Sequence, residues 1–287
     1  MPDRIVEIEG GRLQHGREND RVYIMSLEPE RAAAVVEAAE ALAQEHGYSK
    51  IFAKVSACCR DFLRARDYLE EASIPSLGQG AEKIGEVVFM SRFLNDRRAC
   101  DHDREERLRI LHLAEEKAAA SREQDGADKL PEGFVWRVCD KSACGAMAGL
   151  YRRVFASYPF PIHDPQYLAE TMDTHVIYFG VWESAGGRLA ALSSAETDRA
   201  KGMVEMTDFA TDPEYRGQGF GVFLLRRMEE SMREHKLPVA YTIARAISPG
   251  MNIVFAKLGY RYGGTLINNT DICGRLESMN IWHKHLA

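Results

Sequence analysis

Hydrophobic residues in the C-terminal part of the chain follow two periods, one typical of strands and one typical of helices. Short apolar or alternating runs bounded by turn residues predict strands. Three-residue spacing, as between Val222 and Leu225, predicts an amphipathic helix, and Pro249 and Gly259 mark the start and end of another. We predict strands over residues 134–138, 176–182, 188–193, 203–210 and 238–243, and helices over residues 142–155, 222–234, 251–258 and from residue 164.

The N-terminal part shows the same alternation of strand and helix patterns. An alanine-rich helical stretch ends at Gly47, and Pro75 breaks the pattern that follows the second helix. Strands are predicted over residues 21–26, 48–55 and 86–94, and helices over residues 28–46 and 57–71.

Residues 97–130 are dense in charge and separate the two parts. Leu108, Leu111 and Ala114 form a narrow apolar stripe among charged residues, which predicts a solvated connecting helix. We therefore divide the chain into an N-terminal module (1–96), a charged helical linker (97–130) and a C-terminal catalytic domain (131–287).

Composition narrows the class of protein. A length of 287 residues suggests two domains, and 45% hydrophobic residues suffice for ordinary cores. The formal charge of −6 argues against nucleic acid as a partner and is compatible with a cationic substrate. The sequence lacks a signal-peptide core and an 18-residue apolar run, so we expect a cytoplasmic protein with no membrane partner. It predicts no oligomeric state.

The six cysteines form no C-x-x-C pair. Cys58 and Cys59 are adjacent, and Cys139 and Cys144 are separated by four residues, neither of which is an ordinary zinc spacing. We expect reduced, structural thiols and no metal.

A glycine-rich turn, Arg216-Gly217-Gln218-Gly219-Phe220-Gly221, joins a predicted strand to a predicted helix. Free backbone N–H groups and the helix dipole favour a phosphate at such a position. The spacing fits neither a dinucleotide-binding G-x-G-x-x-G nor a G-K-[ST] loop, but does fit R-x-x-G-x-G.

This pattern, followed by Phe255-Ala256-Lys257-Leu258-Gly259-Tyr260, resembles the GCN5-related N-acetyltransferases over about residues 133–287. The resemblance implies an α/β (α+β) fold with a mixed, splayed central sheet and acetyl-coenzyme A as co-substrate. It also implies that backbone groups of the strand before the loop hold the pantetheine arm. The implied cofactor-binding residues are Phe209, Ala210, Thr211, Arg216, Gly217, Gln218, Gly219, Phe220, Gly221, Ser248, Asn252 and Phe255.

Amine acetylation requires removal of a proton, because an ε-amine has an ordinary pKa of about 10.4. Glu205 lies where several family members carry a general base, and we expect it to act directly or through water. Asp208 is the second catalytic candidate, and strand alternation predicts that it faces the opposite side of the sheet. The alternative for either carboxylate is a surface or substrate-holding charge.

Phe255 departs from the family pattern. Many relatives carry a tyrosine there that protonates the leaving thiolate, and phenylalanine has no proton to give. Either another hydroxyl acts as the acid, or the thiolate leaves without one.

Residues 151–164, 247–252 and 263–270 are similar to one branch of the family, the β-lysine Nε-acetyltransferases, whose product is a compatible solute. That resemblance implies a small-molecule amine as substrate, acetylated in a ternary complex. Alternatives are another small amine, such as lysine or a polyamine, and a non-catalytic acyl-coenzyme A sensor. Substrate-binding candidates are Tyr158, Phe160, His163, Asp164, Asn268 and Asn269, the alternative for the loop residues being a proline-fixed loop that packs its aromatic rings.

The N-terminal order of strands and helices parallels that of residues 239–286. We therefore predict that the N-terminal module is a half-sized acetyltransferase-like unit without a phosphate loop, the alternative being an unrelated small α/β domain.

Overall fold

The computed structural model describes residues 3–77, 84–121 and 129–286, which form two compact units. Unit 1 consists of residues 1–105 and 263–281, and unit 2 consists of residues 106–262 and 282–287. Residues 263–281 thus belong to unit 1, although sequence analysis groups them with the C-terminal domain. Part of the predicted linker, residues 122–128, lies outside the described residues. In the described part of the chain, no helix is long and apolar enough to span a membrane.

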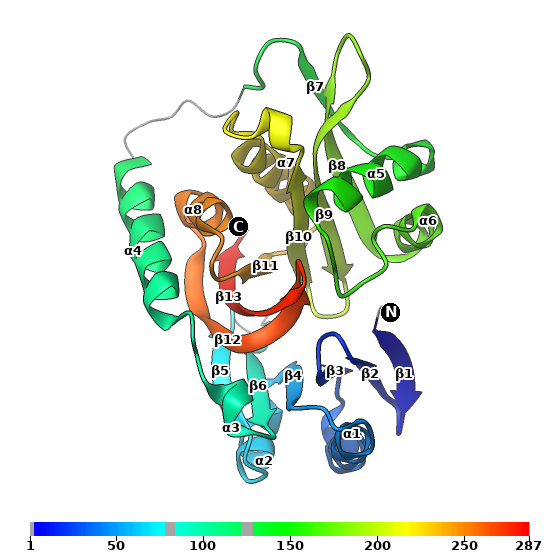
Figure 1. The fold of residues 1–287 in the computed structure, drawn as a ribbon, viewed down its shortest axis with the longest axis vertical. Coiled ribbons are helices and arrows are strands. Elements are labelled where there is room, and N and C mark those ends of the chain that lie inside the picture. Colours follow the sequence, from blue (N-terminus) through cyan, green and yellow to red (C-terminus); the bar gives the residue numbers. More distant parts are fainter. Residues whose placement is uncertain (1–2, 78–83, 122–128, 287) are drawn as a thin grey trace. The chain divides into compact units, whose positions relative to one another are not determined.

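Unit 2 is built on a mixed sheet whose neighbouring strands run β7, β8, β9, β10 and β11 (Figure 1), with the end of β13 next to β11. The pairs from β7 to β10 are antiparallel, and β10 is parallel to β11 through the crossover helix α7. Its elements are α4 (Arg104–Ser121), β7 (Phe134–Val138), α5 (Cys144–Val154), α6 (Pro165–Thr174), β8 (Val176–Glu183), β9 (Leu189–Asp198), β10 (Met203–Thr211), α7 (Phe220–Glu234), β11 (Val239–Arg245) and α8 (Pro249–Lys257).

Strands β10 and β11 diverge after their first three registered residue pairs. Their parallel register runs from Met203 opposite Val239 to Glu205 opposite Tyr241, whereas β10 continues to Thr211 against β9 on its other side. The predicted splayed, mixed sheet is therefore confirmed.

The core of unit 2 lies between this sheet and helices α7 and α8. Val204 and Met206 face Leu224 and Met228 of α7, all four of them buried. Helix α4, predicted as solvated, also contributes Leu111 to this core, while Leu108 is 39% exposed. The apolar stripe of α4 is thus a packing face, and the prediction of a solvated helix was wrong for that face.

Unit 1 has a second mixed sheet with the neighbour order β1, β2, β3, β4, β6, β5 and β12, followed by the beginning of β13. Strands β3 and β4 are parallel and are connected through α1, whose buried alanines and valines pack on them. Its elements are β1 (Arg4–Ile8), β2 (Gly11–Gly16), β3 (Arg21–Ser26), α1 (Ala32–His46), β4 (Lys50–Ser56), α2 (Arg60–Arg64), β5 (Leu69–Ile74), β6 (Val87–Phe93), α3 (Asp96–Ala99), β12 (Arg261–Ile272) and β13 (Arg275–His285).

The long helix predicted over residues 57–71 was wrong. Helix α2 ends at Arg64, Asp67 adopts a left-handed φ of 63°, and β5 begins at Leu69. Leu63 and Tyr68 are both buried against the sheet of unit 1. Tertiary packing on the sheet, rather than local helix propensity, thus decides this segment.

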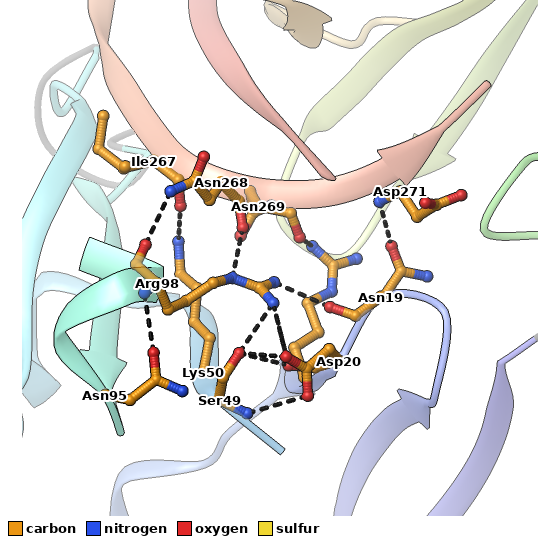
Figure 2. A network of polar contacts seen from close by, with 11 residues as sticks. Asn19, Asp20, Ser49, Lys50, Asn95, Arg98, Ile267, Asn268, Asn269 and Asp271 are labelled. Carbon is orange, nitrogen blue, oxygen red and sulfur yellow. Dashed lines mark hydrogen bonds and ion pairs between the residues drawn. The ribbon is translucent and has the colours of Figure 1, made fainter. Parts of the chain in front are cut away.

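A network of buried cations joins β12 to the N-terminal strands of unit 1 (Figure 2). Lys50 Nζ lies 2.8 Å from Glu71 Oε2 and donates to the Ile267 carbonyl at 2.8 Å. Arg98 Nε donates to the Asn268 carbonyl at 2.7 Å, and Arg21 donates to the Asn269 carbonyl at 2.6 Å. Burial lowers the pKa of Lys50 to about 8. The polar interior of unit 1 thus fixes a segment more than 160 residues distant in sequence.

Candidate active site

The glycine-rich turn forms the N-terminus of α7 with two left-handed residues. Gly217 has a φ of 83° and Gly219, the N-cap residue, has a φ of 80°, a conformation that costs other residues steric strain. No side chain caps this helix, and its first turn carries no acidic residue. The first N–H groups of α7 and the positive end of its dipole are therefore presented to an anion.

The predicted loop residues divide into an exposed set and an anchoring set. Arg216, Gly217, Gln218 and Gly219 are exposed. Phe220, by contrast, is buried and packs edge-on against another core ring, and Gly221 lies against a side chain of α8. The exposed set is positioned to contact a ligand, and the anchoring set fixes the start of the helix.

Asp212 fixes the entry to this loop, and sequence analysis missed it. Its buried carboxylate accepts hydrogen bonds from Arg153 Nε at 3.0 Å and from Arg188 at 2.9 Å. Burial alone would raise the pKa of Asp212, but hydrogen bonds from Arg188 and from the Glu214 N–H hold it below its ordinary value. The Asp-Pro pair at residues 212 and 213, typical of a helix N-cap, was an available signal.

A bulge in β10 directs Asp208 into the protein. The register shifts between Thr207 and Ala210, and Asp208 has a left-handed φ of 53°. Its buried carboxylate accepts a hydrogen bond from Ser194 Oγ at 2.6 Å and another from the Tyr158 hydroxyl. Burial raises the pKa of Asp208, although both hydrogen bonds act in the opposite direction.

The bulge also corrects the predicted face of Asp208. Ser194 is the cross-strand partner of Thr207, which lies two residues from Glu205 and so on the same face of β10. Since Asp208 contacts Ser194, both candidate carboxylates belong to one face of the sheet. The prediction of opposite faces was wrong because strict alternation does not extend through a bulge.

Glu205 lies at the last registered pair before β10 and β11 diverge. It is half-buried, with Tyr241 opposite it on β11 and Glu196 opposite it on β9. The Tyr241 hydroxyl donates to Glu205 Oε2 at 2.8 Å. The structure thus places this carboxylate, with a tyrosine beside it, where the sheet opens.

The remainder of β10 lines that opening. Ala210 and Thr211 are paired with β9, and the register with β11 ends at Glu205, so their outward backbone groups are available to a pantetheine arm. Phe209 packs edge-on against Phe255 of α8, with ring centroids 5.6 Å apart. Phe255 is fully buried, so its ring supports Phe209 of β10 from the protein interior.

Asn252 is engaged in the interior. Its side-chain amide donates to the carbonyls of Arg245 and Ser248 at 3.0 and 2.8 Å, and its oxygen accepts from Trp282 Nε1 at 2.9 Å. These contacts tie the turn between β11 and α8 to the end of β13. Ser248 is half-buried at the N-cap of α8.

The predicted acceptor loop lies between α5 and α6, and its residues have separate surroundings. Tyr158 reaches Asp208, and burial together with that neighbouring charge raises the pKa of Tyr158 well above its ordinary value. Phe160 and His163 are half-buried, and burial lowers the pKa of His163. Asp164 caps α6 by accepting the Gln166 N–H at 2.9 Å. The structure therefore brings Tyr158 alone of this set into contact with a candidate catalytic carboxylate.

Asn268 and Asn269 belong to unit 1. The Asn268 side chain donates to the carbonyls of Arg98 and Cys100, both at 2.8 Å, and Asn269 is buried beside Thr270. Their surroundings are those of the cation network of unit 1.

Comparison with known proteins agrees with this geometry. The sequence model of the acetyltransferase (GNAT) family matches residues 146–260, which include Glu205 and the glycine-rich turn. The β-lysine N(6)-acetyltransferase of Methanococcus maripaludis is 35% identical over 282 residues, covering 98% of this chain and 98% of that protein. The β-lysine N(6)-acetyltransferase of Methanosarcina mazei is 38% identical over 178 residues, covering 60% of this chain and 65% of that protein.

Among solved structures, the ribosomal-protein-S18-alanine N-acetyltransferase of Escherichia coli matches with a TM-score of 0.46 and 16% identity, covering 54% of this chain and 94% of that one. The family assignment follows from the sequence relatives, one of which is similar along almost its whole length. The chain belongs to the acetyltransferase (GNAT) family.

Proposed function

We propose that this protein transfers the acetyl group of acetyl-coenzyme A to the ε-amine of β-lysine (3,6-diaminohexanoate), giving Nε-acetyl-β-lysine. The observation that carries the proposal is the similarity to the M. maripaludis β-lysine N(6)-acetyltransferase over 98% of both chains. The uncapped, acid-free N-terminus of α7 supports a phosphate-bearing acyl donor. The half-buried Glu205 supports an amine as acceptor.

The acyl donor would bind along β10 and the glycine-rich turn. The N–H groups around Gly219, with Arg216, would hold the diphosphate. Outward backbone groups of Phe209, Ala210 and Thr211 would hold the pantetheine arm where β11 has diverged. Acetyl-coenzyme A supplies the activated acyl group as a thioester.

Glu205 would accept the proton that the ε-ammonium group must lose, directly or through water. The neutral amine nitrogen then forms a bond to the carbonyl carbon, and the bond from that carbon to sulfur breaks. The second proton, which the nitrogen loses as it becomes the amide, passes to solvent water. Phe255 has no proton to give, so we propose that coenzyme A leaves as the thiolate, an ordinary thiol having a pKa of about 8.5. The transfer is direct, within a ternary complex.

The acceptor would lie on the face of β10 that carries both carboxylates. Tyr158, Phe160 and His163 would line it from the loop, and Asp208 would hold Tyr158 in place. Acetylation removes one positive charge from β-lysine and leaves a zwitterion of zero net charge. Such a product suits a compatible solute made in the cytoplasm for osmoadaptation.

Thiol release in the presence of acetyl-coenzyme A tests this proposal. The protein would be incubated separately with β-lysine, α-lysine and spermidine, and the product mass would be measured. We expect release with β-lysine and a product heavier by one acetyl group on the ε-nitrogen. Turnover of spermidine without turnover of β-lysine would overturn the assigned acceptor. Tight acetyl-coenzyme A binding without release for any amine would indicate an acyl-coenzyme A sensor.

A further inference from the structure

Three side chains lie in one row across the strands where the sheet of unit 2 opens. Glu205 is at the centre on β10, Glu196 is opposite it on β9, and Tyr241 is opposite it on β11. Tyr241 is 4% exposed, and its hydroxyl donates to Glu205 Oε2 at 2.8 Å. The row therefore gives Glu205 a like charge on one side and a hydrogen-bond donor on the other.

This asymmetry has a physical consequence for the Glu205 carboxylate. Directly opposed residues on antiparallel strands have Cβ atoms about 4.5–5.5 Å apart, and like charges at that distance repel. A tyrosine hydroxyl, in contrast, forms a stronger hydrogen bond with an ionised carboxylate than with a neutral group. Both effects turn the carboxylate of Glu205 toward β11.

The buried position of Tyr241 fixes the geometry of its hydrogen bond to Glu205. Its ring is packed within a central strand, so its hydroxyl oxygen has a fixed location, and it registers with Glu205 at the last parallel pair. The bond to Oε2 therefore fixes one carboxylate oxygen of Glu205 and with it the orientation of the group. A general base needs this fixed orientation because proton transfer requires hydrogen-bond reach.

We propose that Tyr241 is a positioning residue for the acetyl transfer: its bond to Oε2 holds the Glu205 carboxylate in the orientation in which it receives the proton of the acceptor amine. This inference rests on the proposed function, in which Glu205 is the base. Tyr241 touches neither reactant in this scheme and acts through Glu205.

The variant Tyr241→Phe tests the proposal. We expect kcat/KM for the amine to fall about tenfold, the scale of one lost hydrogen bond to a charged group, with KM for acetyl-coenzyme A unchanged. The lost hydrogen bond favours the ionised carboxylate, so the acidic limb of the pH profile should move to higher pH. In a Glu205→Gln background, Tyr241→Phe should change the rate less than twofold, because the base is already removed.

Tyr68→Phe is the matched control, since it also removes one buried tyrosine hydroxyl, in unit 1. Its pH profile should equal that of the wild type. An unchanged profile for Tyr241→Phe, or the same loss of rate with and without the carboxylate of Glu205, would overturn the positioning role.

The assay uses whichever amine the wild-type protein acetylates, so an error in the acceptor leaves the test of Tyr241 intact. Absence of turnover with every amine would instead overturn the proposed function, and the positioning role with it.

Discussion

The chain contains two strand–helix–strand crossovers with the same surroundings, β3–α1–β4 in unit 1 and β10–α7–β11 in unit 2 (Figure 1). Two antiparallel strands lead into each crossover. The neighbour orders β1-β2-β3-β4-β6 and β8-β9-β10-β11-β13 correspond position by position. This correspondence supports the prediction of a half-sized module in unit 1, which superposition of the two backbones would test.

The two crossovers differ most at the start of their helices. In unit 2, Gly217 and Gly219 adopt left-handed φ values, and the first turn of α7 is free of acidic residues. In unit 1, Pro29 and Glu30 occupy the single 3-10 turn before α1. A glutamate at the positive end of a helix opposes anion binding. The features that favour a phosphate therefore lie in the loop and not in the framework that both units share.

The two parallel strand pairs differ along their length as well. β3 and β4 stay in register over four of the six residues of β3, whereas β10 and β11 do so over three of the nine residues of β10. The first pair is Arg21 with Lys50 in unit 1, and Met203 with Val239 in unit 2. Unit 1 thus begins its parallel pair with two buried cations, whereas unit 2 begins its pair with two apolar residues and its strands diverge sooner.

The largest expected effect concerns the third residue pair, which is Glu205 with Tyr241 in unit 2 and Tyr23 with Phe52 in unit 1. Glu205→Gln should lower turnover by about 10²–10³-fold at neutral pH, because a general base contributes on this scale. The loss should shrink toward pH 10, where the amine is increasingly neutral without help. Steady-state rates between pH 6 and pH 10 measure both.

Glu196→Gln, which neutralises the opposed carboxylate on β9, is the control for a general loss of charge at this row. A Glu205→Gln profile parallel to that of the wild type at every pH would exclude Glu205 as the base.

The next largest effect concerns the first residue pair of β3 and β4 in unit 1, Arg21 with Lys50. Lys50→Met should lower the free energy of unfolding by about 3 kcal/mol, because Glu71 stays buried without its counter-charge. Burial lowers the pKa of Lys50 from 10.5 to about 8, so the unfolded chain binds more protons between these values. The wild type should therefore gain stability relative to the variant as the pH rises from 8 toward 10.

Chemical denaturation at several pH values measures this difference. Lys117→Met, at an exposed position of α4, should stay within about 0.5 kcal/mol of the wild type. An equally small change for Lys50→Met would show that the buried pair does not hold unit 1 together.

Local signals made part of this architecture readable from the sequence. The glycine-rich turn, the Asp164 cap and the proline at the start of α8 all act within a few residues, and each of these helices begins within two residues of its predicted start. Asp208 was a predicted candidate, but its face was predicted wrongly because a bulge interrupts the two-residue period of the strand.

Local sequence patterns could not predict contacts between residues that are distant in the sequence. The pairing of Glu205 with Tyr241 requires the parallel register of two strands separated by a helix. The bond from Arg98 to the Asn268 carbonyl joins residues 170 apart, and no periodicity encodes it. For this reason the sequence did not reveal that residues 263–281 belong to unit 1.

The third prediction concerns an acidic residue in the glycine-rich turn of unit 2, comparable to Glu30 before α1 in unit 1. Gly219→Asp should raise KM for acetyl-coenzyme A about 100-fold, because a carboxylate at the helix N-terminus repels the diphosphate. Gly219→Asn is the matched control, since asparagine tolerates the left-handed conformation and has nearly the same shape without charge. Gly219→Asn should raise KM for acetyl-coenzyme A about tenfold less than Gly219→Asp does. Equal effects of the two substitutions would assign the loss to backbone strain instead of charge.

The smallest effect concerns a part of unit 2 for which the described residues of unit 1 have no counterpart, the loop between α5 and α6. Tyr158→Phe removes one of three hydroxyl donors to Asp208, the one that bonds the loop to β10. KM for the amine should rise about tenfold, as for one hydrogen bond to a charged group, with KM for acetyl-coenzyme A unchanged. Ser194→Ala removes a second donor, which lies on strand β9, and leaves the bond from Tyr158 in place. If both variants raised KM for the amine equally, Asp208 itself would hold the acceptor, and anchoring of the loop would not be its role.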